Sequence, residues 1–179
     1  MNNLKDRAKQ IKLLALDVDG VLTQGDLTFS QDGIEYKTFN VKDGQGLVCF
    51  KNAGFVIAII TARQNGTVEH RAKTLGIQEL HQGVKYKLGV LETLLEKYNL
   101  AFENIAYVGD DLPDICILEK VGLSCCPNDA VDEVKEVAIF KSKFNGGKGA
   151  VREVCDFILK SKNIEPLEIV KQMQMNSLK

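Results

Sequence analysis

The sequence predicts an α/β fold, with a Rossmann-like parallel sheet that carries helices on both faces. Short apolar runs, typical of buried parallel strands, alternate along the chain with longer stretches of helical periodicity. Several of these runs end directly in polar residues, as strands do at the edge where open α/β sheets bind ligands. The 179 residues suffice for one hydrophobic core, and we expect a single domain over residues 1–179.

The composition excludes several classes of partner. A net charge of -1 gives no reason to expect binding to nucleic acid or to an anionic membrane. No apolar run approaches membrane-spanning length, and the polar first residues hold no signal-peptide core. The five cysteines have no C-x-x-C spacing and lie mostly among apolar residues, so we expect buried, reduced thiols. We therefore expect a cytoplasmic protein.

The first elements are a short lead-in helix within residues 1–10 and a strand over residues 12–16. An insert over about residues 24–42 then alternates apolar and polar side chains around Gly33, which predicts a β-hairpin. A two-stranded hairpin is marginally stable alone, and its apolar side chains, such as Leu27 and Phe29, need cover. We therefore expect this hairpin to pack on another subunit.

The remaining elements alternate regularly. We expect strands over residues 55–60, 77–80, 105–108, 123–126 and 138–140, and helices over about residues 43–52, 64–75, 86–98, 129–137 and 150–160, with another ending near residue 120. Asp43 would cap the first of these helices, whereas Gly76 and Asn99 would end the second and third. The tail, about residues 161–179, would form one more short helix or dock on a neighbouring molecule.

Polar side chains follow the predicted strands where each strand ends. Asp17 and Asp19 end the first strand, Thr61 and Asp110 each follow another, and Lys87 lies just beyond a third. Because the carboxyl ends of parallel strands share one edge of the sheet, we expect these residues to converge. Taken alone, the pair of aspartates also fits a polar strand end with no further meaning.

The expected cluster contains carboxylates, one hydroxyl and one ammonium group, without histidine. An oxygen-only site of this charge suits Mg²⁺, and a hydroxyl and an ammonium group beside the metal would bind a phosphoryl group. Alternatives remain for three of the residues. Thr61 would serve as a helix cap, Lys85 would replace Lys87, and Asp114 would be an acidic residue at the start of a helix, where the helix dipole favours it.

The motifs and their order resemble those of the haloacid dehalogenase superfamily of aspartate-nucleophile phosphatases. The matching motifs are Asp17-Val18-Asp19-Gly20-Val21, Thr61, Lys87 and Gly109-Asp110-Asp111-Leu112-Pro113-Asp114. Residues 39–44, 82–88 and 146–153 are similar to one branch, the 3-deoxy-D-manno-octulosonate 8-phosphate phosphatases. The match covers about residues 11–160.

The resemblance implies a phosphatase mechanism. Asp17 would attack phosphorus and form an aspartyl-phosphate, while Asp19 would protonate the leaving alkoxide and then activate water. Mg²⁺ would be held by the carboxylates of Asp17 and Asp110 and by the backbone carbonyl of Asp19.

The resemblance gives supporting roles to four further residues. Thr61 and Lys87 would hold the phosphoryl oxygens, and Lys87 rather than Lys85 matches the family pattern. Asp111 and Asp114 would orient metal-bound water or Lys87.

Neither the hairpin insert nor the 25 residues between Thr61 and Lys87 can form a cap domain over the site. The resemblance implies instead a homotetramer in which hairpins associate and a neighbour completes the pocket. It also implies a sugar-acid phosphate substrate, foremost 3-deoxy-D-manno-octulosonate (KDO) 8-phosphate, a lipopolysaccharide precursor. Relatives that act on nine-carbon nonulosonate phosphates tend to carry an acidic residue in place of Arg63, so Arg63 favours the eight-carbon sugar.

Arginine is the preferred partner of a carboxylate, which an ulosonic acid carries. The positions that match the substrate contacts of the family are Asn40, Val41, Lys42, Asp43, Gly44, Arg63, Arg71 and Lys87. Ala62 replaces a common glycine, and Val48 stands where some members have arginine, which weakens one contact. Solvated helix arginines are the alternative interpretation of Arg63 and Arg71.

Three other functions compete with this hypothesis. A nonulosonate 9-phosphate phosphatase would use the same catalytic residues. A phosphoacceptor signalling module also gathers aspartates, a threonine and a lysine at strand ends, but it does not need Asp19 as an acid. A scaffold protein with a relict site would not need the full set of catalytic residue types.

Overall fold

The computed structural model describes residues 4–176 and confirms the predicted fold class. Six parallel strands form one sheet in the order β5-β4-β1-β6-β7-β8. Their bounds are β1 Leu13–Leu16, β4 Val56–Ile60, β5 Glu79–His81, β6 Ile105–Val108, β7 Leu123–Cys126 and β8 Phe140–Lys141. The chain runs from β1 to one edge and resumes on the other side of β1 at β6, which makes the β1–β6 boundary the switch point where such sheets bind ligands.

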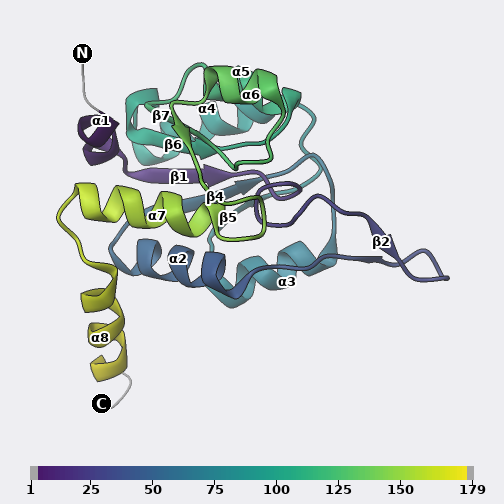
Figure 1. Cartoon of the computed structure of the whole chain (residues 1–179), viewed down its shortest axis with the longest axis horizontal. Helices are drawn as coiled ribbons and strands as arrows, with labels where there is room; N and C mark the ends of the chain where they lie inside the picture. The colour runs from purple at the N-terminus through teal and green to yellow at the C-terminus, as the bar shows by residue number, and fades with distance from the viewer. Residues whose placement is uncertain (1–3, 177–179) are drawn as a thin grey trace.

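Helices cover both faces of the sheet (Figure 1). One face carries α2 Val41–Asn52, α3 Gly66–Leu75 and α7 Ala150–Ser161, with α1 Leu4–Gln10 and α8 Pro166–Asn176 packed beside them. The other face carries α4 Lys87–Tyr98, α5 Ile115–Leu118 and α6 Asp132–Val137. Residues 1–3 of the expected lead-in helix and 177–179 of the tail lie outside the described residues.

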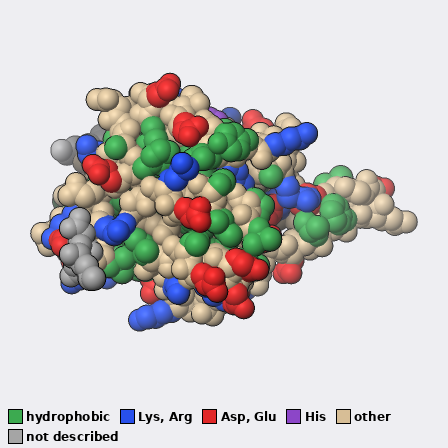
Figure 2. Space-filling model, turned by 90° about the horizontal axis from the view of Figure 1, so that it is seen from above, with side chains coloured by type: hydrophobic (Ala, Val, Ile, Leu, Met, Phe, Trp, Pro, Cys, Tyr) green, Lys and Arg blue, Asp and Glu red, His purple; other side chains and the backbone are tan. Residues whose placement is uncertain are grey.

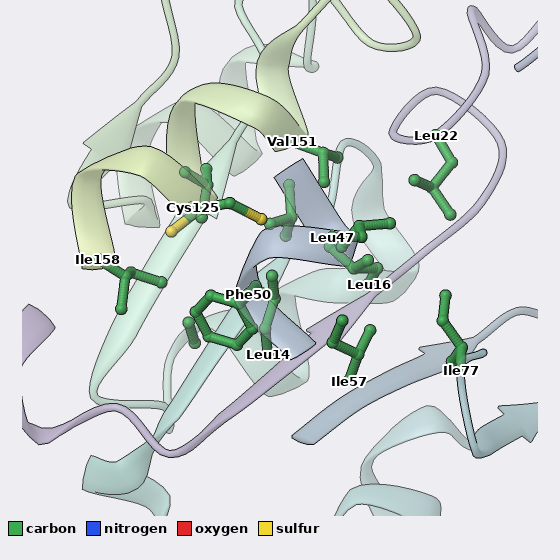
Figure 3. Packing of buried hydrophobic residues seen from close by; sticks show 14 of the residues in the cluster. Leu14, Leu16, Leu22, Leu47, Phe50, Ile57, Ile77, Cys125, Val151 and Ile158 are labelled. Atoms are coloured by element: carbon green, nitrogen blue, oxygen red, sulfur yellow. The ribbon is translucent and has the colours of Figure 1, made fainter. Parts of the chain in front are cut away.

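Strand β1 is buried on both of its faces, which explains why its sequence is apolar throughout. Leu14 and Leu16 belong to the core under α2 and α7, whereas Leu13 and Ala15 belong to the core under α4. Successive side chains of a strand point to opposite faces, so a strand covered on both sides needs apolar residues at every position. Figure 3 shows Leu14 and Leu16 packed with Phe50 in the first of these cores.

The hairpin insert forms as predicted, from the short antiparallel strands β2 Thr28–Phe29 and β3 Glu35–Tyr36. Gly33 lies in its turn with φ +79°, a conformation that glycine adopts without a steric cost. The hairpin extends from the body of the protein (Figure 1). Its large apolar side chains are more than half exposed: Leu27, Phe29, Ile34 and Tyr36.

The beginning of α2 corrects one prediction, because Asn40 and not Asp43 caps this helix. The Asn40 side chain accepts a hydrogen bond from the backbone N–H of Lys42, at 2.8 Å. Asp43 lies inside the helix, is buried, and accepts bonds from the backbone N–H groups of Gly149 and Arg152 at the start of α7. Its carboxylate therefore joins two helices instead of capping one.

Two helices are shorter than predicted. After β6 the chain first makes a 3₁₀ turn, Leu112–Asp114, and then the single turn of α5. The expected helix over residues 129–137 begins only at Asp132, because the N–H of Val131 is bonded to the carbonyl of Asp110 in the loop after β6. The left-handed ends of α3 at Gly76 and α4 at Asn99 confirm the predicted stops, and the tail forms α8.

Most of the cysteine side chains are buried, as expected. All five cysteines are free thiols, and four of them are buried. Among residues 4–176, no helix combines the length and the apolar character needed to cross a membrane.

Candidate active site

A cavity of about 250 Å³ opens at the carboxyl edge of the sheet. Strand β1 delivers Asp17 and Asp19 to it, β4 delivers Thr61, β6 delivers Asp110, and α4 begins there with Lys87. The structure thus brings together the residues that the strand ends predicted. The convergence follows from the shared direction of the parallel strands.

Lys87 lies at the centre of the site and is only 4% exposed. Its Nζ atom is 2.7 Å from Oδ2 of Asp17 and 2.8 Å from Oδ1 of Asp114. Burial opposes the charge, but these two ion pairs outweigh it and raise the pKa of Lys87. Lys87 therefore stays protonated beside Asp17, whereas the side chain of Lys85, its predicted rival, is exposed.

Asp114 lies behind the cavity, fully buried, and its carboxylate is saturated with donors. Oδ1 accepts bonds from Nζ of Lys87 and, at 2.6 Å, from the hydroxyl of Tyr107. Oδ2 accepts bonds from the backbone N–H groups of Asp110 and Asp111, at 3.0 and 3.4 Å. The carboxylate therefore fixes both the lysine and the loop after β6.

Asp110 has the unmet bonding capacity expected of a metal ligand. Its Oδ1 atom is buried without a hydrogen-bond partner among the described residues. Burial, reinforced by the neighbouring carboxylates of Asp114 and Asp17, raises the pKa of Asp110 to about 8. Carboxylate oxygens of the three residues lie within 4.8 Å of one another. A hard cation such as Mg²⁺ would neutralise this concentration of charge, so the residues fit the metal.

Asp17 and Gly20 also suit a metal site beside Asp110. Burial raises the pKa of Asp17 to about 6, although the adjacent Lys87 acts in the opposite direction. A Cβ atom at Gly20 would lie 1.9 Å from Oδ2 of Asp110, so only glycine lets this carboxylate approach the β1 loop so closely. Asp114 is less suited to bind metal directly, because its oxygens already accept four hydrogen bonds.

Thr61 is buried at the end of β4 and lines the cavity. Its hydroxyl oxygen accepts a bond from the backbone N–H of Arg63 at 3.4 Å. The following helix is capped by Asn65, whose side chain accepts a bond from the N–H of Thr67 at 2.8 Å. The alternative role of Thr61 as the cap of this helix is therefore excluded.

Asp19 is engaged by the hairpin. Its Oδ1 atom accepts a hydrogen bond from Nζ of Lys37, and its Oδ2 atom lies 3.8 Å from Nε of Arg63. Glu35 joins the two cations, with Oε1 2.9 Å from Lys37 and Oε2 2.8 Å from Arg63. The adjacent cations Lys37 and Arg63 lower the pKa of Glu35 to about 2. Four charged groups from the β1 loop, the hairpin and the β4 loop thus form one network.

Sequence reasoning missed Lys37, Glu35 and Tyr107. A signal existed for the first two, because Glu35 and Lys37 occupy alternate positions of the predicted hairpin, where side chains two apart are expected on one face. From its sequence context, Tyr107 is expected to be a core residue of β6. Nothing in the sequence indicates which group its hydroxyl would bond.

The other predicted substrate contacts do not line this cavity within one chain. Arg71 points to the start of α2, where it donates to the carbonyl of Asn40 at 3.4 Å and lies 5.9 Å from the centre of the Phe39 ring. Asp43 is committed to the start of α7, and Val41 is 79% exposed. Only Arg63 and Lys87 of the predicted substrate-binding set reach the cavity.

Comparisons with known proteins agree with this geometry. The family of haloacid dehalogenase-like hydrolases matches residues 80–154. The 3-deoxy-D-manno-octulosonate 8-phosphate phosphatase KdsC of Escherichia coli K12 is 48% identical over 153 residues, which cover 86% of this chain and 81% of that protein.

Two solved structures extend the likeness to the fold. A haloacid dehalogenase hydrolase of subfamily III A from Legionella pneumophila has a TM-score of 0.92 at 42% identity, over 96% of this chain and 94% of that one. The 3-deoxy-D-manno-octulosonate 8-phosphate phosphatase of Moraxella catarrhalis, solved with magnesium, phosphate and KDO, has a TM-score of 0.88 at 41% identity, over 91% of this chain and 94% of that one. The chain therefore belongs to the 3-deoxy-D-manno-octulosonate 8-phosphate phosphatase family of the haloacid dehalogenase-like hydrolases.

Proposed function

We propose that this protein is a Mg²⁺-dependent phosphatase that hydrolyses KDO 8-phosphate to KDO and phosphate, a step in lipopolysaccharide precursor synthesis. The observation that carries the proposal is the contact of Lys87 with Asp17 beside an oxygen of Asp110 that has no hydrogen-bond partner within residues 4–176. A nucleophile, a cation and a metal-binding carboxylate are thus within reach of one phosphoryl group. The identity to KdsC and the KDO-bound relative support the choice of substrate.

In the first step, a carboxylate oxygen of Asp17 attacks phosphorus and the bond from phosphorus to the sugar oxygen breaks. Asp19 gives a proton to the departing alkoxide, so the sugar leaves as a neutral alcohol. The ammonium group of Lys87 orients Asp17 and binds phosphoryl oxygens, and the Thr61 hydroxyl binds another. The carboxylates of Asp17 and Asp110 and the backbone carbonyl of Asp19 would hold Mg²⁺, whose charge offsets that of the phosphoryl group.

In the second step, Asp19 takes a proton from water, which attacks phosphorus and releases phosphate from Asp17. Asp114 keeps Lys87 in place through both steps by its 2.8 Å ion pair. Asp111 lines the same cavity and would orient metal-bound water.

Arg63 is our candidate for binding the sugar carboxylate, because its half-exposed guanidinium lies at the rim of the cavity. Asn40, Val41, Lys42 and Arg71 lie outside the cavity of their own chain and would meet substrate only across a subunit contact, whereas Asp43 and Gly44 are buried. We propose a homotetramer in which the hairpins associate. Figure 2 shows the hairpin as an arm with apolar side chains on its surface, and burial of these side chains is the driving force we invoke.

We also propose that the whole chain acts as one domain in the cytoplasm, where free thiols such as its five cysteines persist.

Measurement of phosphate release from a panel of sugar phosphates, with and without Mg²⁺, tests the function. We expect Mg²⁺-dependent turnover that is fastest with KDO 8-phosphate. Preference for a nine-carbon nonulosonate 9-phosphate would support the alternative function, and no release from either class would overturn both.

A further inference from the structure

The hairpin places a buried cation against the proposed acid/base. The side chain of Lys37 is 2% exposed, although Lys37 follows directly on a strand that projects from the body of the protein. Its Nζ atom contacts Oδ1 of Asp19 and Oε1 of Glu35. A lysine ammonium group is rarely withdrawn from water unless carboxylates compensate it, so this position is held by its two partners.

The contact with Asp19 distinguishes the two oxygens of its carboxylate. Oδ1 is occupied by Lys37, whereas Oδ2 accepts no hydrogen bond from residues 4–176 and lies 3.8 Å from Nε of Arg63. Oδ2 is therefore the oxygen free to exchange a proton with the leaving group and with water. Without Lys37, rotation about χ2 would interchange the two oxygens and the carboxylate would lose its fixed direction.

Glu35 links the two cations, because one carboxylate pairs with Lys37 through Oε1 and with Arg63 through Oε2. Glu35 and Lys37 lie two residues apart at the end of β3, and exposed Ile34 and Tyr36 alternate with them. The hairpin thus carries apolar side chains for a neighbouring molecule and charged side chains for its own active site.

Building on the proposed function, we propose that Lys37 is a positioning residue for Asp19, with Glu35 holding Lys37 in place. Lys37 directs Oδ2 of Asp19 toward the leaving oxygen, and this matters most when the leaving group must be protonated. A sugar alkoxide needs the proton, whereas p-nitrophenolate departs as a stable anion. Lys37 therefore contributes to the first chemical step with alkyl phosphates and little to that step with aryl phosphates.

Kinetics of Lys37→Met with KDO 8-phosphate and with p-nitrophenyl phosphate test this inference. We expect kcat for KDO 8-phosphate to fall about 10- to 100-fold, the range typical of a misplaced catalytic group, with KM within about 3-fold. The kcat/KM for p-nitrophenyl phosphate, which reports the first chemical step, should change less than about 3-fold on the same reasoning. Lys37→Arg, which keeps a cation, should restore most of the activity, and Lys73→Met on the exposed surface of α3 is the matched control.

Each outcome separates the inference from the function on which it rests. An equal loss with both substrates, or no loss, overturns the positioning role while wild-type turnover upholds the function. Wild-type protein that hydrolyses neither substrate overturns the function itself. If Lys37→Met does not fold, Glu35→Gln takes its place. A fall in kcat for KDO 8-phosphate with an unchanged kcat/KM for p-nitrophenyl phosphate then supports the inference, and an equal fall in both contradicts it.

Discussion

The Nζ atom of Lys87 lies 2.7 Å from Oδ2 of Asp17, in a site where both side chains are largely removed from water. Lys87 reaches this position from the first residue of α4 and is held from behind by Asp114. One ammonium group thus joins the proposed nucleophile to a buried carboxylate. Several expected effects of substitution depend on this arrangement.

Replacement of Lys87 by Met should impair both stability and activity. Two carboxylates would remain in the interior without their cation, and loss of one partner of a buried ion pair costs about 3–5 kcal/mol. Phosphate release should fall at least about 100-fold, as for loss of a group that stabilises transition-state charge. Urea unfolding and phosphate assays measure the two effects. Lys85→Met, two residues away and exposed, should change the unfolding free energy by less than about 0.5 kcal/mol.

Replacement of Tyr107 by Phe should lower activity through Asp114. The change removes one hydroxyl donor from a fully buried carboxylate and should cost about 1–3 kcal/mol of stability. Because Asp114 positions Lys87, we also expect kcat to fall.

Tyr98→Phe is the matched control for that variant, because the Tyr98 hydroxyl also donates to a buried carboxylate, that of Glu79 outside the cavity. It should destabilise the protein and leave kcat unchanged. An unchanged kcat in Tyr107→Phe would show that Asp114 needs no help from the tyrosine.

Mg²⁺ should bind more tightly as pH rises from 6 to 8. In the metal-free protein the pKa of Asp110 is raised to about 8 and that of Asp17 to about 6, so protons compete with the metal across this range. Release of one proton corresponds to about a tenfold gain in affinity per pH unit below 8. Titration calorimetry at pH 6, 7 and 8 measures the affinity for Mg²⁺. An affinity independent of pH would contradict the assignment of Asp110 and Asp17 as metal ligands.

The same pKa shifts predict how the metal-free protein responds to pH. A carboxyl group whose pKa is raised on folding binds protons more tightly in the native state, so stability falls as pH rises from about 4 to about 8. Asp110→Asn should weaken this dependence and remove most of the Mg²⁺ binding. Thermal unfolding of both proteins across the range, without metal, provides the comparison.

Replacement of the exposed apolar side chains of the hairpin by aspartate should prevent the proposed association of subunits. Ile34 is 59% exposed and Tyr36 54% exposed, and both would lie buried between associated hairpins. Ile34→Asp combined with Tyr36→Asp should convert the oligomer to smaller species in light scattering after gel filtration, since unpaired carboxylates resist burial. Gln31→Asp in the exposed turn should leave the mass unchanged. A wild-type monomer would contradict the proposed assembly.

The sequence was sufficient to predict most of the strands and the acidic residues at the carboxyl edge of the sheet. A parallel strand covered on both faces must be apolar throughout, so β1 and β6 stand out, and the residue after each strand lies at a known edge. Asp17 and Asp110 were therefore placed without knowledge of the loops. Distinguishing Lys87 from Lys85 required the family pattern, since both lie near the start of one helix.

What the sequence did not predict depends on contacts between distant segments. The bonds from Asp43 to the start of α7 join residues more than 100 positions apart, and local capping rules gave Asp43 a different role. The contact of Lys37 with Asp19 depends on how the hairpin folds back over the β1 loop, which no local periodicity encodes. The bond from the Tyr107 hydroxyl to Asp114 depends on the position of the Asp114 carboxylate behind the cavity, which the sequence does not indicate.

We propose Asp17 as the nucleophile of a Mg²⁺-dependent KDO 8-phosphate phosphatase. Steady-state phosphate release from KDO 8-phosphate tests it most directly, with wild-type protein and the near-isosteric Asp17→Asn, each with Mg²⁺ and with chelator. We predict rapid release only by the wild type with Mg²⁺, and loss of at least about 1,000-fold in the variant, whose amide cannot form the covalent intermediate. Substantial turnover by a folded Asp17→Asn protein, or by the wild type without a divalent metal, would contradict the account.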